Sequence, residues 1–128
     1  MTVAAQVHEN FKLFTGKPDS SGNIGGLADS VAAWVAAERV APKSIGIEFL
    51  ERSKTLLLSV GYRRGDEEAY TIKLSSTNIS RVGDIGPGDL ERIENGMAAA
   101  AAAETNVICH ELYVTDGDEL FMVTMART

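Results

Sequence analysis

Hydrophobic and polar residues alternate with a repeat of two over three short stretches between Ser44 and Ser75. This alternation predicts strands, because every second side chain of a strand points to the same face of its sheet. Charged turn segments separate the stretches, so we expect a three-stranded meander. Its outer face is largely polar, apart from Leu50 and Leu57, which could belong to a partner surface. The core face is expected to carry ten residues: Ile45, Ile47, Phe49, Leu56, Leu58, Val60, Tyr62, Tyr70, Ile72 and Leu74.

Two segments show the spacing of a helix. Between Leu27 and Val40, apolar residues recur at i, i+4, i+7 and i+8, and Pro42 is expected to end this first helix. A loop rich in glycine and proline precedes a second helix that opens at Asp89. Within it, Gly96 and an alanine tract leave little side-chain bulk, which predicts close packing against a sheet or another helix. The apolar face of the second helix is predicted to contain Leu90, Ile93, Met97 and Ala101.

The N-terminal segment, residues 2–15, fits two structures. Val3, Val7, Phe11 and Phe14 follow a helical stripe, whereas Val7, Phe11 and Leu13 also fit one face of a strand. We favour a helix at the start of the chain, with the strand as the open alternative.

A second hairpin is predicted near the C-terminus, where Asp116-Gly117 is a favoured two-residue connection. That turn would pair Leu112 with Phe121. It would place His110 on a face with Ile108, Leu112, Phe121, Val123 and Met125. The other face would then carry five residues that we take as a candidate interface or pocket: Cys109, Glu111, Tyr113, Leu120 and Met122. Because both faces are apolar, we expect the hairpin to be covered on both sides, in part by another copy of the chain.

The predicted elements describe one α+β domain over residues 1–128, with an antiparallel sheet made of the meander and the hairpin and two main helices on one face. The net charge of −6 disfavours nucleic acid as a partner, since it would repel a phosphate backbone. The alanine tract Ala98–Ala103 is much shorter than a membrane helix. The N-terminus has no pattern of a secretory signal, and Cys109 is the single cysteine, so we expect a cytoplasmic protein.

No pattern of reactive residues predicts catalysis. Cys109, His110 and Glu111 are adjacent, but neighbours on a strand point to opposite faces, so Cys109 and His110 are not expected to form a nucleophile and base. His110 is expected to be a core histidine bonded to a backbone carbonyl. The two histidines, His8 and His110, have no metal-ligand spacing around them, and the glycine-rich loops match no phosphate-binding motif, so no cofactor or metal is expected.

The order helix, three strands, helix and two strands resembles that of the class I chaperones of type III secretion, which are similar in size and acidic charge. The likeness lies in these general features alone. We expect a non-enzymatic protein-interaction or chaperone-like module that acts as a homodimer, with another protein as a further candidate partner. The alternative is a small-molecule-binding protein or modest enzyme with a pocket between helix and sheet near Glu111 and Tyr113.

Overall fold

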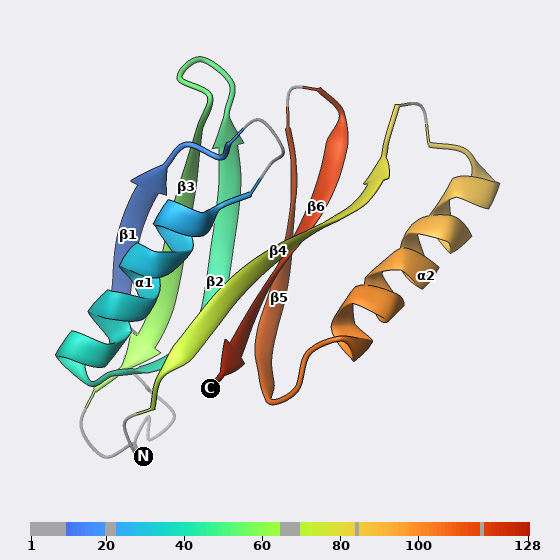
Figure 1. Cartoon of the computed structure of the whole chain (residues 1–128). Coiled ribbons are helices and arrows are strands. Elements are labelled where there is room, and N and C mark those ends of the chain that lie inside the picture. The colour runs from blue at the N-terminus through green and yellow to red at the C-terminus, as the bar shows by residue number, and fades with distance from the viewer. Residues whose placement is uncertain (1–9, 20–22, 65–69, 84, 116) are drawn as a thin grey trace, which may run out of the picture.

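The computed structural model describes residues 10–19, 23–64, 70–83, 85–115 and 117–128. Within these ranges, two helices and six strands follow one another (Figure 1). The α+β class expected from the sequence is confirmed, and both helices pack against sheet. The elements are β1 (Asn10–Gly16), α1 (Gly25–Glu38), β2 (Ala41–Leu50), β3 (Thr55–Arg63), β4 (Ile72–Arg81), α2 (Pro87–Ala102), β5 (Val107–Val114) and β6 (Glu119–Arg127).

The strands form two antiparallel sheets. The first sheet has the order β1-β3-β2 and the second has the order β4-β6-β5. The two sheets meet where β2 lies beside β5. The expected meander is therefore wrong in its third strand, because β4 pairs with β6 and not with β3. Alternation shows which face of a strand is apolar, but it carries no information about which distant strand will be its neighbour.

The first described element is a strand, so the helix favoured for residues 2–15 is wrong over Asn10–Gly16, while residues 2–9 lie outside the described ranges. β1 pairs with β3 along its whole length, from Asn10 opposite Tyr62 to Gly16 opposite Leu56. The main-chain hydrogen bonds of this ladder favour the strand, which the alternation of Phe11 and Leu13 also fits.

The end of α1 also differs from the expectation. The helix ends at Glu38, and Arg39 takes a left-handed conformation with φ 53°, while its N–H donates to the carbonyl of Val35 at 2.9 Å. This is a backbone C-cap. Pro42, which was expected to end the helix, lies inside β2, where the register shifts between Pro42 and Ser44. Proline lacks an N–H, so it is tolerated at such an interruption of the ladder.

One hydrophobic core is shared by the two sheets and α1. The helix lies between β1 and β4 and buries Leu27, Val31 and Val35 (Figure 1). The second sheet contributes residues of β6, among them Val123 and Met125. We call the sheet faces toward this core inner and the opposite faces outer. All ten residues predicted for the core lie in it: Ile45, Leu56, Leu58, Val60, Ile72 and Leu74 are buried, and Ile47, Phe49, Tyr62 and Tyr70 are partly buried against them.

The helix α2 packs on the outer face of the second sheet, against β4 and β6. Ile93 is its buried residue, and a Cβ on Gly96 would stand only 3.0 Å from Cγ2 of Ile79, which confirms the expected close packing. At the other end of α2, the carboxylate of Glu104 lies 3.1 Å from the Lys73 ammonium. The expected placement of both helices on one face is therefore corrected, since α1 lies on the inner side and α2 on the outer side.

The strand β6 is covered on both sides, because every residue from Leu120 to Ala126 is buried. This confirms the expectation for one strand of the hairpin. On the outer side, α2 of the same chain provides cover, while the expected contribution of another copy stays a prediction. The outer side of β5 is more open, with Leu112 and Val114 exposed.

The hairpin register is shifted by one residue from the prediction. Three residues connect Thr115 to Glu119, whose carbonyl accepts a hydrogen bond from the Thr115 N–H at 3.0 Å. The left-handed conformation falls on Asp118, with φ 60°, and Asp116 lies outside the described residues. A three-residue loop that ends in a left-handed residue is the next common hairpin connection after the two-residue turn. It pairs Leu112 with Met122 instead of Phe121.

Candidate functional site

The five residues predicted to form one interface or pocket lie on two sides of the second sheet. Cys109, Glu111 and Tyr113 share the inner face, where they are paired with Met125, Val123 and Phe121 of β6. Leu120 and Met122 lie on the outer face, which α2 covers. The predicted common surface is therefore corrected, because a one-residue shift of register moves every side chain of one strand to the other face relative to its partner.

Cys109 lies on the inner face of β5, where the two sheets meet. Burial raises the pKa of its thiol to about 11, although a contact with the main chain of Ile45 opposes this rise. The thiol is therefore protonated near neutral pH, whereas a nucleophilic cysteine needs a thiolate. This environment is that of a structural cysteine.

Tyr113 and Glu111 are not arranged as an acid and base pair. The Tyr113 ring stacks on Phe121, with ring centroids 5.3 Å apart and planes at 12°, and burial raises the pKa of its hydroxyl to about 12. Glu111 is partly buried, and its carboxylate accepts a hydrogen bond from the N–H of Leu112 at 3.4 Å. Each side chain thus has a structural partner.

His110 is not in the core. It is exposed on the outer side of β5, and its Nδ1 lies 3.0 Å from Oγ1 of Thr124 on β6. The expected bond to a backbone carbonyl is replaced by this side-chain contact across the strand pair. The change has the same cause as before, since the three-residue loop pairs His110 with Thr124. The other histidine, His8, lies outside the described residues.

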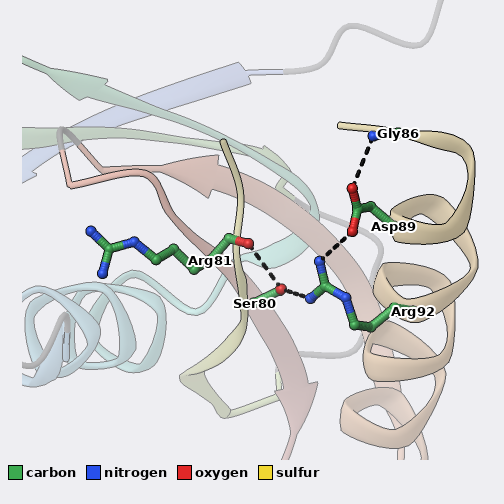
Figure 2. Close-up of polar contacts among 5 residues, drawn as sticks. All are labelled: Ser80, Arg81, Gly86, Asp89 and Arg92. Atoms are coloured by element: carbon green, nitrogen blue, oxygen red, sulfur yellow. Dashed lines mark hydrogen bonds and ion pairs between the residues drawn. The ribbon is translucent and has the colours of Figure 1, made fainter. Parts of the chain in front are cut away.

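A cavity of about 120 Å³ opens beside the start of α2. Figure 2 shows that Arg92 lies between Asp89 and Ser80, whereas the guanidinium of Arg81 points away from α2. Arg92 donates to Asp89 Oδ1 at 3.0 Å and also to the Ser80 hydroxyl. The cavity is lined by Arg81, Val82, Gly83, Ile85, Asp89 and Arg92.

Asp89 and Arg92 form an ion pair beside this cavity, and Arg81 adds a second positive charge to its lining. The second carboxylate oxygen of Asp89 accepts the N–H of Gly86 at 2.9 Å, which is half of a capping box at the start of α2. These contacts with Gly86 and Arg92 hold the pKa of Asp89 below its usual value. The carboxylate of Asp89 therefore occupies the positive end of the helix, and the loop before α2 forms its cap.

The outer face of the first sheet carries exposed apolar residues beside polar ones such as Glu48 and Thr55. Phe11 and Leu13 of β1 are 66% and 61% exposed, and Leu50 of β2 is also exposed. Leu57 of β3 is partly buried on the same side. We call these four residues the open face. Sequence reasoning singled out Leu50 and Leu57 but missed the two most exposed residues, although the alternation of Phe11 and Leu13 was the signal for them.

The centre of the open face is lined by small residues. Phe11 is paired with Gly61, and Leu13 is paired with Ser59. Ser59 is in turn opposite Gly46, where a Cβ would stand 2.9 Å from the serine hydroxyl. On the outer side, the part of the first sheet around Gly46, Ser59 and Gly61 thus carries no bulky side chain, which allows another element to approach its main chain closely.

Among the described residues, no group of three or more histidine, cysteine, aspartate or glutamate side chains could hold a metal ion. In the same part of the chain, neither helix has the length and apolar character needed to cross a bilayer. Comparison of the chain with protein families, curated proteins and solved structures finds no match.

Proposed function

We propose that the protein is a non-enzymatic interaction module that acts as a homodimer through its open face. The observation that carries this proposal is the pair Phe11 and Leu13, which are adjacent on one face of β1 and both more than three-fifths exposed. Contiguous apolar residues on a sheet face are typical of a surface that binds another protein. Leu50 and Leu57 extend the apolar surface across the first sheet.

The side chains of β5 that were considered for catalysis also support an interaction module over the alternative of an enzyme. The Cys109 thiol is held protonated, and the Tyr113 ring is stacked in the core. The cavity described above lies at the start of α2 and is not lined by Glu111 or Tyr113. We assign the protein to the cytoplasm as part of this proposal, since a single, partly buried cysteine suits a reducing compartment.

Sedimentation velocity at micromolar concentration tests the homodimer. We expect a species of twice the 13.7 kDa chain mass for the wild type. The variant Phe11→Asp should be monomeric, because a carboxylate buried in an apolar contact is left without a partner. Ala36→Asp places the same charge on the exposed side of α1 and serves as the matched control, which should remain dimeric. A monomeric wild type would overturn the proposal.

A further inference from the structure

The chain contains the same arrangement of elements twice. β1, α1, β2 and β3 form the first half, and β4, α2, β5 and β6 form the second. In each half the first strand pairs with the third, and the third pairs with the second. The third strands, β3 and β6, both have nine residues. The two halves can therefore be compared position by position.

The comparison places Phe11 at the position of Leu74. Phe11 is opposite Gly61, the seventh residue of β3, and Leu74 is opposite Met125, the seventh residue of β6. The two positions differ sharply in burial, since Leu74 is 8% exposed and Phe11 is 66% exposed. The reason is α1, which reaches from its own half to β4 and covers the inner face there.

No described element makes the corresponding contact in the first half. If α2 were placed on the first half as α1 is placed on the second, it would cover the outer face of β1 at Phe11 and Leu13. Instead, α2 packs on β4 and β6 of its own half, held by Ile93 and by the ion pair of Glu104 with Lys73. Figure 1 shows α2 on the far side of the second sheet from β1. Within one chain, α2 therefore leaves the open face uncovered.

We propose that α2 of a second copy covers the open face, and that the two copies do this reciprocally. The inference rests on the proposed homodimer and names the contact that forms it. A reciprocal contact uses both open faces and both α2 helices in a closed, twofold dimer, so that neither open face is left to extend the assembly.

The exposed flank of α2 fits this role. Leu90 lies three residues before the buried Ile93, at the edge of the sheet-facing side, and is 54% exposed, while Ala98 and Ala102 on the same flank, farther from the sheet, are exposed and lack bulk. Small side chains on the helix match the small residues at the centre of the open face and permit a short distance between the main chains. The charges near the contact are mixed, because Lys17, exposed just beyond β1, is opposite in sign to the exposed Glu91 and Glu94 of α2, whereas Glu48, exposed beside Leu57 on the open face, is like in sign.

A mixing experiment tests the contact. Phe11→Asp damages the open face, and Leu90→Asp damages the exposed flank of α2. Each variant alone should dissociate at least roughly tenfold more readily than the wild type in sedimentation experiments. In an equimolar mixture, the intact face of one variant meets the intact helix of the other, so dimers that contain both variants should form. Ala36→Asp again controls for added charge, and circular dichroism checks that each variant is folded.

The outcomes separate this inference from the proposed function. If Phe11→Asp is monomeric while Leu90→Asp remains as dimeric as the wild type, the homodimer stands and the role of α2 is overturned. If neither variant weakens the dimer, both the open face and the role of α2 are overturned. As a second measurement, Leu13→Cys combined with Leu90→Cys in a Cys109→Ser background should give a disulfide-linked dimer on a non-reducing gel. Cross-linking of Leu13→Cys alone but not of the pair would count against the contact.

Discussion

Gly96 of α2 and Ile79 of β4 approach so closely that a Cβ on the glycine would stand 3.0 Å from the isoleucine Cγ2. Replacing Gly96 with valine should push α2 away from the second sheet. We expect the free energy of unfolding to fall by about 2 kcal/mol, because overpacking of a contact strains both partners. Denaturation in urea measures the change.

Alanine at the same position provides the control. In an Ile79→Ala background, Gly96→Ala should gain about 1 kcal/mol from its higher helix propensity. In the wild type the gain should be smaller, since the new methyl meets Cγ2 of Ile79. An equal gain in both backgrounds would show that the two residues do not restrict each other.

The hairpin register gives a prediction that needs no substitution. Leu112 is paired with Met122, and the neighbouring His110 with Thr124. Because Thr115 and Glu119 are hydrogen bonded, alternation along the ladder makes the Leu112 and Met122 pair a non-hydrogen-bonded one, in which the two Cα atoms are closest. Nuclear magnetic resonance should show a strong contact between their Hα protons. A contact between the Hα protons of Leu112 and Phe121 instead would restore the two-residue turn.

The thiol of Cys109 should make stability depend on pH in the alkaline range. Its pKa is raised by burial from 9.0 to about 11, so the folded state holds the proton more tightly than the unfolded chain. The stabilisation is complete below pH 9 and is lost as the pH rises toward 11. Relative to Cys109→Ser, the wild type should lose on the order of 1 to 2 kcal/mol over this range. Urea denaturation at several pH values measures the difference, and parallel curves for the two proteins would contradict the burial of the thiol.

The carboxyl group of Asp89 should make stability depend on pH in the acid range, with stability lost as the pH falls. Its pKa is lowered by the Gly86 N–H and by Arg92, so its contribution is present above the usual value of 3.8 and is lost as the pH falls below it. Asp89→Asn should lower the melting temperature at pH 7. The difference from the wild type should shrink when both are melted at pH 3. Thr77→Asn, a polar change at an exposed position of β4, should show no such dependence on pH.

The sequence was a good guide to local features and a poor one to distant pairing. The ten core residues were predicted because alternation directly reports which face of a strand is buried. The close packing at Gly96 was predicted because a glycine inside a helix is costly, which favours a position where a larger side chain would not fit. The partners of β4 and β1 could not be predicted, since pairing between strands far apart in the chain depends on packing that no short pattern contains.

The candidate site failed for a smaller reason. One residue of loop length decided whether Met122 shares a face with Glu111 or with Leu112, and Asp116-Gly117 permits both loops. Likewise, Phe11 fits both the helical stripe and the strand pattern, whereas Leu13 fits the strand alone, so the exposed pair could be recognised only once β1 was placed beside β3.

Because β6 is buried on both faces, it separates two packed layers, one on the side of α1 and one on the side of α2. Val123 belongs to the layer that contains α1, and its neighbour Met122 belongs to the layer beneath α2. If α2 detached, the shared core around α1 would remain packed, but the outer face of β6 between Leu120 and Ala126 would become exposed to solvent. Detachment of α2 alone would therefore produce a folded but aggregation-prone protein, which we expect to precipitate before it unfolds globally.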